Sequence, residues 1–308
     1  MRAVRIEGHQ VAVVDVPDPE GEGVVAEVLS SSICGTDLSL VAAGAAGFTL
    51  GHEFVVAVDG VPYAVEPTVW CGACEECRAG HTQRCTGEHG NLGVFTDGGL
   101  ADRVLVRRQA LVALPEGLGP AEACLVEPAA VAWHGVARAT VEPGERVVVV
   151  GGGSIGLLAV AALRDLGHDV DLEARHPGQR QAGEHLGAGT PDGLYDVVIE
   201  AAGSASGLAR CAELARPGAR VVLLGVFWDT VPVPGPASLI KELTVIAAMA
   251  YGRSGGTREV DQAAALLAGH PEVAETLITH RFGLDEAPRA FAVAGDRAAG
   301  AIKVVLAP

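Results

Sequence analysis

The stretch RVVVVGGGSIGLLAVAALRDLG, residues 146–167, restricts the possible folds of this chain more than any other segment. It combines a short apolar run, the glycine pattern G-x-G-x-x-G and an apolar stretch with helical spacing. Further strand candidates, separated by helical stretches, lie at residues 168–174, 195–201, 219–225 and 242–249. Because short apolar strands alternate with helices, we predict an α/β domain with a doubly wound parallel sheet that helices cover on both faces.

The glycine pattern predicts a dinucleotide site of the Rossmann type. Gly151 permits a tight turn, Gly153 lets a pyrophosphate approach the backbone, and Gly156 lets the helix pack on the strand. An ordinary glycine-rich turn is the alternative, but the strand before the pattern and the helix and strand after it favour a cofactor. The predicted cofactor residues of this turn and of the later strand ends are Gly151, Gly153, Ser154, Ile155, Gly156, Ala202 and Gly225.

The end of the second strand bears on the choice between NAD and NADP. NAD sites usually carry an acid there, about 20 residues beyond the glycines, which binds the ribose 2′-hydroxyl. Here that position falls on Ala174, followed by Arg175 and His176, and a small residue followed by basic ones suits a 2′-phosphate. Glu173 lies one place earlier, so a shift of one residue would restore an acid of the NAD type. We predict NADP in preference to NAD.

Length and charge exclude several kinds of protein. A chain of 308 residues suggests about two domains. With 22 basic and 38 acidic residues the formal net charge is −16, which disfavours nucleic acid and membranes as partners. The N-terminus has no signal-peptide core, and no apolar run reaches about 18 residues. We therefore predict a cytoplasmic protein whose seven cysteines are ligands or free thiols rather than disulfides.

Four cysteines lie close together in the stretch CGACEECRAGHTQRC, residues 71–85. The spacing C-x2-C-x2-C-x7-C lets the thiolates converge on a tetrahedral metal ion, whereas iron–sulfur clusters use other spacings. Four thiolates fill the coordination shell, so this site would maintain shape rather than perform chemistry. The predicted ligands of a structural zinc are Cys71, Cys74, Cys77 and Cys85.

A second set of possible ligands is scattered along the chain. Cys34 lies in ICGTD, His52 and Glu53 lie in LGHEF, and Glu127 lies in LVEPAA. A cysteine, a histidine and one or two carboxylates suit a zinc ion with an exchangeable position. Each residue also has an ordinary interpretation, as a buried thiol, a loop histidine or a helix-capping acid. Spacing alone does not decide between the two.

Together these motifs resemble the zinc-containing medium-chain alcohol dehydrogenase superfamily, and most closely its sorbitol, threonine and cyclitol dehydrogenase branch. The resemblance covers almost the whole chain and rests on ICGTDL, LGHEFV, VEPxxxCGxCxxCxxGxxxxC, DGGLADRVLV, LVEPAAVAWH, VVVVGGGSIG, DVVIEAAG, KELTVI and AGAIKVVL. It implies a Rossmann domain at residues 128–250. It also implies a mostly β, GroES-like catalytic domain, formed by residues 1–127 and 251–308, with the zinc lobe at 71–85.

The resemblance also implies roles for the scattered residues. Cys34, His52 and Glu127 match the ligands of a catalytic zinc, and Glu53 matches a neighbouring carboxylate that can replace water on the metal. Two zinc ions per chain are therefore implied. The implied activity is hydride transfer between a nicotinamide cofactor and a secondary alcohol, polyol or cyclitol, or the matching ketone. A homodimer or homotetramer is implied as well, because the family often forms them.

The residues after Cys34 match the family only in part. Thr36 matches a hydroxyl that touches the substrate oxygen, and Asp37 matches an acid behind the zinc-bound histidine. Many relatives continue the proton relay with a histidine where this chain has Ser39. Residues 35–51 and 54–70 form shorter segments than the family pattern. Both flank the pocket or its support, so the size of the substrate stays open.

Two other functions remain open at this stage. One is a zinc-independent NADPH reductase of small carbonyls or activated alkenes, which the set Cys34, His52 and Glu127 argues against. The other is a catalytically silent relative that binds the cofactor, because a fold does not guarantee a function. Asp171 and Glu173 are unusual acids for a buried parallel strand, and the sequence offers no account of them.

Overall fold

The computed structural model describes residues 1–254 and 256–308. The chain forms two compact units, one of residues 1–127 with 252–308 and the other of residues 128–251. Each unit has its own sheet and its own apolar core, so each is described separately below. Within the described residues, no helix is both long and apolar enough to cross a membrane.

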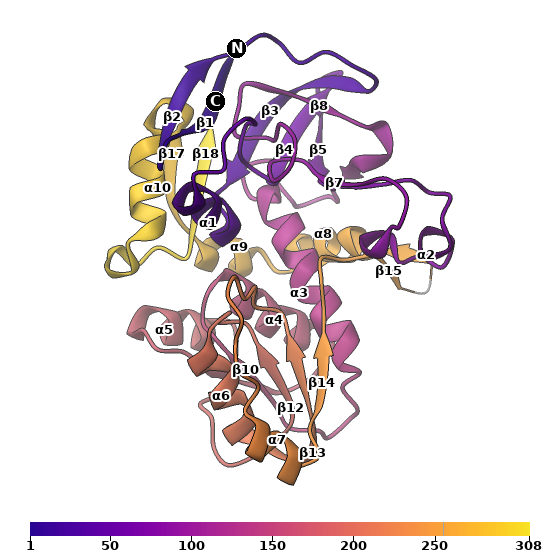
Figure 1. Cartoon of the computed structure of the whole chain (residues 1–308), viewed down its shortest axis with the longest axis vertical. Coiled ribbons are helices and arrows are strands. Elements are labelled where there is room, and N and C mark those ends of the chain that lie inside the picture. The colour runs from indigo at the N-terminus through magenta and orange to yellow at the C-terminus, as the bar shows by residue number, and fades with distance from the viewer. Residues whose placement is uncertain (255) are drawn as a thin grey trace. The chain divides into compact units, whose positions relative to one another are not determined.

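The second unit is built on a five-stranded parallel sheet in the order β11-β10-β12-β13-β14 (Figure 1). All five strand candidates of the sequence are confirmed, and so is the α/β fold with a parallel sheet. The interior strand β10 is a run of buried valines because both faces of the sheet are covered. The strands are β10 (Val147–Val150), β11 (Val170–Glu173), β12 (Tyr195–Glu200), β13 (Ala215–Leu223) and β14 (Thr244–Ala247).

Helices pack on both faces of this sheet. On one face, Val148 and Val150 of β10 belong to a core cluster with residues of α6. On the other face, Leu172 of β11 packs against Gly183 of α5, where a larger residue would collide with the leucine side chain. The helices of this part of the chain are α3 (Val126–Ala139), α4 (Ser154–Asp165), α5 (Pro177–His185), α6 (Ala205–Leu214) and α7 (Gly235–Ile240).

The structure accounts for the two acids of β11. The hydroxyl of the fully buried Tyr195 donates to Asp171 at 2.7 Å. Arg210 on α6 forms an ion pair with Glu173. Because each acid has a polar partner, neither leaves an unsatisfied charge in the protein.

The sheet has one strand fewer than the six-stranded Rossmann pattern. Its order corresponds to 2-1-3-4-5, whereas the six-stranded pattern places a third strand beside the second. In the described chain, residues 186–194 lead directly from α5 to β12, and β11 is therefore an edge strand. Gly189 makes a single bridge with Asp171, which covers part of that edge. This shortening was not predicted from the sequence.

The first unit contains a sheet in the order β17-β18-β3-β4-β5-β9, with β8 also paired to β3. The connection from β4 to β5 is a two-residue hairpin at Asp59 and Gly60, with φ angles of 52° and 78°, which an Asp-Gly pair adopts readily. The strands of the unit are β1 (Arg2–Glu7), β2 (Gln10–Asp15), β3 (Val24–Ser32), β4 (Glu53–Val58), β5 (Val61–Val65), β6 (Thr68–Trp70), β7 (His89–Asn91), β8 (Arg103–Val106), β9 (Leu111–Ala113), β15 (Arg253–Ser254), β16 (Thr257–Arg258), β17 (Ile278–Gly283) and β18 (Lys303–Ala307).

The last strand, β18, enters this sheet between β17 and β3. Val305 pairs with Ser32 and Leu306 pairs with Ser31, both in antiparallel register. A strand from the end of the chain therefore lies beside one from its beginning, and Lys303 comes close to the residues that follow β3. The helices of the unit are α1 (Gly35–Ala43), α2 (Glu75–Arg78), α8 (Glu259–Gly269), α9 (Pro271–Leu277) and α10 (Ala287–Gly295).

Candidate functional site

The four clustered cysteines converge at one point of the first unit. Their sulfur atoms all lie within 4.8 Å of one another, and the Sγ atoms of Cys74 and Cys85 are 3.9 Å apart. The turn after β6 and the short helix α2 present the first three thiols, and the short helical turn at Thr82–Arg84 leads to the fourth. All four are free thiols rather than disulfides.

Backbone amides surround these sulfur atoms. The N–H groups of Ala73 and Cys74 donate to the Sγ atom of Cys71, and the N–H group of Cys77 donates to Cys74. These donors lower the pKa of Cys71, and those of Cys77 and Thr86 lower the pKa of Cys74 to about 5. Burial raises the pKa of Cys77 to about 12, so the surroundings favour the thiolates of Cys71 and Cys74 but not that of Cys77. Four converging sulfur atoms still fit a tetrahedral zinc with no open position.

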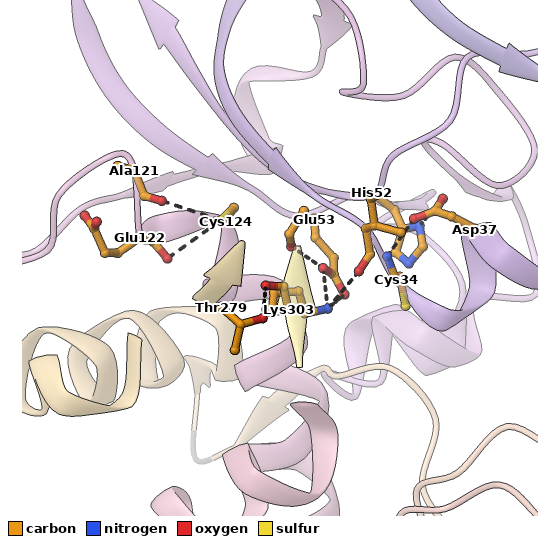
Figure 2. A network of polar contacts seen from close by, with 11 residues as sticks. Cys34, Asp37, His52, Glu53, Ala121, Glu122, Cys124, Thr279 and Lys303 are labelled. Atoms are coloured by element: carbon orange, nitrogen blue, oxygen red, sulfur yellow. Dashed lines mark hydrogen bonds and ion pairs between the residues drawn. The ribbon is translucent and has the colours of Figure 1, made fainter. Parts of the chain in front are cut away.

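The second predicted set is partly assembled in the same unit. Cys34 precedes α1, His52 precedes β4 and Glu53 is the first residue of β4. One ligand atom from each lies within 4.8 Å of the others (Figure 2). His52 and Glu53 are buried, and Cys34 is partly exposed. A soft thiolate beside an imidazole fits zinc, so the donor set agrees with the metal that the sequence predicted.

Asp37 lies behind the histidine of this set. It is fully buried in the first turn of α1, and its Oδ2 atom accepts the backbone N–H of Cys34 at 2.8 Å. Its Oδ1 atom lies 3.6 Å from Nδ1 of His52, and neither of these two atoms has a hydrogen-bond partner among the residues that the structure describes. Burial opposes a charged imidazole, but Asp37 and Cys34 raise the pKa of His52 well above its ordinary value. Because Nδ1 faces the acid, Nε2 is left for a metal ion.

Glu53 has a partner that the sequence analysis missed. Both of its carboxylate oxygens accept hydrogen bonds from Nζ of the buried Lys303, at 2.8 and 2.7 Å (Figure 2). Ser32 also donates to one of them. Burial opposes the charge on Lys303, yet Glu53 raises the pKa of this lysine above its ordinary value. In this arrangement Glu53 serves the ion pair, so a metal would have to share this carboxylate with Lys303. No local motif signals a partner 250 positions away.

The remaining predicted residues of this set have varied positions. Thr36 is partly exposed at the start of α1. The hydroxyl of Ser39 donates to the carbonyl of Gly35 at 3.1 Å, so it is engaged by its own helix. Glu127 lies in the first turn of α3 and is mostly buried, but it does not belong to the group within 4.8 Å. Its place as a zinc ligand stays a prediction.

The glycine turn of the second unit has the geometry that a dinucleotide requires. Gly151 has φ 118°, and a Cβ atom there would lie 2.7 Å from the backbone of Ala201. A Cβ atom at Gly156 would overlap the carbonyl oxygen of Gly151. At Gly153, by contrast, a Cβ atom would meet nothing within 4 Å. The turn is therefore tight where the backbone packs and open where a pyrophosphate would approach the start of α4.

The end of β11 is cationic in the structure. Ala174 is buried, Arg175 is exposed and His176 precedes α5. Arg180, which the sequence analysis did not single out, donates to the carbonyl oxygens of Ala174 and Arg175 at 2.9 and 2.8 Å. The acid Glu173 is held by α6. Strand β11 ends at the acid Glu173, with Ala174 directly after it, so the choice between NADP and NAD stays a prediction.

Another residue that the sequence analysis missed is Glu200. This carboxylate is fully buried at the end of β12 and accepts the N–H groups of Ala202 and Gly203 at 3.1 and 3.2 Å. Burial raises its pKa. A Cβ atom at Gly225 would lie against the same carboxylate, and one at Gly207 would lie 2.6 Å from it. Glu200 therefore shapes both strand ends that carry the predicted cofactor residues Ala202 and Gly225.

Known proteins resemble both parts of the chain. Residues 20–116 match the family described as the alcohol dehydrogenase GroES-like domain, and residues 146–269 match the family described as zinc-binding dehydrogenase. The chain is 28% identical to L-galactonate-5-dehydrogenase of Escherichia coli, over 87% of this chain and 86% of that protein. It is also 28% identical to sorbitol dehydrogenase of Bacillus subtilis, over 80% of each. A solved structure of a zinc-binding dehydrogenase from Sinorhizobium meliloti, bound to NADP, has a TM-score of 0.85 and 32% identity, and the match covers 100% of this chain and 99% of that one.

Proposed function

Because the chain belongs to the zinc-containing medium-chain alcohol dehydrogenases and is an NAD(P)-dependent oxidoreductase of secondary alcohols, we propose that it acts on polyols, cyclitols or sugar acids and the matching ketones. The observation that supports the site of this reaction is the convergence of Cys34 and His52, with Asp37 behind the imidazole. The names of the relatives support the substrate class, since they include a sugar-acid and a polyol dehydrogenase.

We assign the catalytic zinc to Cys34, His52 and Glu127, and a structural zinc to the cysteine lobe. Zinc held by these residues would supply a Lewis acid that lowers the pKa of the substrate hydroxyl, and a bound nicotinamide cofactor would supply the hydride acceptor. Asp37 fixes the tautomer and the direction of the histidine ring. Thr36 accepts the substrate's hydroxyl proton at Oγ1 while its own hydroxyl proton moves to water, because Ser39 is no base near neutral pH. With both metals bound, the chain would hold two zinc ions.

We assign NADP as the preferred cofactor, with NAD as the poorer one. The small Ala174 leaves room for a 2′-phosphate, and Arg175 and Arg180 supply positive charge beside it. The relative solved with NADP supports the same assignment. The remaining predicted phosphate-turn residues, Ser154 and Ile155, place their backbone at the start of α4.

The first experiment is a substrate screen on zinc-replete protein. Polyols, cyclitols, sugar acids and simple secondary alcohols would each be tested with NADP and with NAD, and the absorbance of the reduced cofactor would be followed. We expect turnover of one polyhydroxy class, faster with NADP. Reduction of small carbonyls or activated alkenes by protein that carries a single zinc would instead establish a zinc-independent reductase. Cofactor binding without any turnover would indicate a silent relative.

We also propose that the chain forms a homodimer or a homotetramer in the cytoplasm. Strand β14 pairs only with β13 among the described strands, and it leaves one edge open. Large apolar side chains on and near that edge are exposed, among them Leu239, Ile240 and Met249. Pairing of the edge with a second copy would cover them. Light scattering on a sizing column tests this, and Ile240→Glu is expected to yield monomers.

A further inference from the structure

Arg210 lies outside every motif that the sequence analysis used. It projects from α6 to the last residue of β11, where its Nε and one terminal nitrogen bind the two oxygens of Glu173 at 2.7 and 3.0 Å. Its other terminal nitrogen binds Glu213, one turn further along the same helix, at 2.9 Å. Two parallel charge-assisted bonds are geometrically specific, and both side chains are partly shielded from water, so this pair is stronger than an ordinary surface pair.

Glu173 occupies a sensitive position for cofactor choice. Its backbone oxygen accepts the N–H of Gly151, the first glycine of the phosphate turn, at 2.9 Å. The next residue, Ala174, occupies the position at which NAD sites carry their ribose-binding acid. A free carboxylate here would repel a 2′-phosphate and would offer an acceptor to a 2′-hydroxyl.

The other charged groups at this strand end are basic. Arg175 lies on the turn from β11 to α5, and Arg180, which belongs to α5, is anchored to two carbonyl oxygens of that turn. Glu173 is the one acid of the segment 173–180. Whether the strand end attracts or repels a phosphate therefore depends on where the carboxylate of Glu173 points and on what neutralises it.

We propose that Arg210 determines cofactor specificity by holding Glu173 against α6 and neutralising it, so that the ribose end of the site presents only positive charge. Arg210 acts through Glu173 and is a positioning residue, not a phosphate ligand. This inference rests on the proposed preference for NADP. It goes beyond that preference because it explains how the chain keeps an acid beside the ribose position without selecting NAD.

The test is the ratio of the dissociation constants of NADH and NADPH, measured by fluorescence titration of the zinc-loaded protein without substrate. The wild type is expected to bind NADPH more tightly. Arg210→Gln frees the carboxylate and is expected to lower the preference about tenfold, mainly by weakening NADPH. The double variant Glu173→Gln/Arg210→Gln removes the freed charge and is expected to restore the preference. Arg210→Lys keeps a neutralising charge and is expected to retain most of the preference for NADPH.

Glu213→Gln is the matched control, because it removes the other partner of Arg210 and leaves the pair with Glu173 intact. It is expected to leave the ratio unchanged. A shift as large as that of Arg210→Gln but in the opposite direction, towards NADPH, would overturn the proposal in favour of the overall charge of α6. A double variant that stays as poor as Arg210→Gln would show that Arg210 binds the phosphate itself. An unchanged ratio in Arg210→Gln would refute the proposed role of Arg210 and leave the proposed preference for NADP standing. A wild type that prefers NADH would refute the proposed cofactor as well.

Discussion

The two metal-ligating regions of the first unit are built in opposite ways. The cysteine lobe draws all its ligands from residues 71–85, and backbone amides of the same segment surround the sulfur atoms. The second region, the site of Cys34 and His52, is called the open site below, and its two ligands come from separate segments. The neighbouring carboxylate of Glu53 is held by Lys303 from the end of the chain. The lobe is a local structure that a metal can complete. The open site exists only once the whole sheet has formed.

This difference implies different consequences of mutation. Loss of a ligand from the lobe should remove folding free energy, because a structural metal contributes directly to stability. Loss of a ligand from the open site should remove chemistry and leave the fold, because the sheet around it is held by its own core and strand pairing. The following predictions test that contrast, and they run from the largest expected effect to the smallest.

Cys77→Ser is expected to lower the melting temperature by about 10 °C or more, because the lobe loses its metal and the folding free energy that goes with it. Differential scanning calorimetry, with zinc content measured in parallel, checks this. Cys211→Ser is the matched control, since Cys211 is a buried thiol outside both ligand sets. Equal effects of the two substitutions would mean that the lobe contributes nothing beyond the packing of a thiol.

Lys303→Met is expected to destabilise the protein by about 3–5 kcal/mol, because it leaves the buried carboxylate of Glu53 without its cation. The double variant Glu53→Gln/Lys303→Met removes both charges and is expected to recover most of that loss. Urea unfolding measures both. If the double variant is as unstable as the single one, the packing of the lysine chain rather than the ion pair is what stabilises this region.

Lys303 also shows how far the sequence could predict this molecule. The parallel sheet, its five strands and the cysteine cluster follow from local signals, namely apolar runs, glycines and thiol spacing. The partners of buried charges do not, since Lys303, Arg210 and Glu200 meet their partners only after strands and helices pack. The shortened connection before β12 was missed because a deletion leaves no residue pattern of its own.

Asp37→Asn is expected to lower turnover or the affinity of the open site for zinc about 10- to 100-fold, because an amide no longer fixes the histidine as a carboxylate does. The melting temperature is expected to stay within a few degrees of the wild type. Steady-state kinetics at several zinc concentrations measures this effect. Ser39→Ala on the same helix is the control, and it is expected to change turnover less than about twofold because its hydroxyl is engaged by Gly35.

Glu200→Gln is expected to weaken NADPH binding a few-fold, the smallest of these effects. A glutamine replaces one carboxylate oxygen by an NH2 group, which cannot accept, so one of the amides of Ala202 and Gly203 loses its partner. Fluorescence titration measures the affinity, and zinc content and turnover at saturating cofactor are expected to stay near wild type. A drop in melting temperature without any change in affinity would restrict Glu200 to a structural role.

The most direct test of the contrast between the two regions is Cys34→Ser, measured for zinc content, turnover and melting temperature in one preparation. We predict two zinc ions per chain in the wild type and one in the variant, no measurable turnover in the variant, and a melting temperature close to that of the wild type. Retained turnover, or loss of both zinc ions with unfolding, would contradict the assignment of chemistry to the open site and of shape to the lobe.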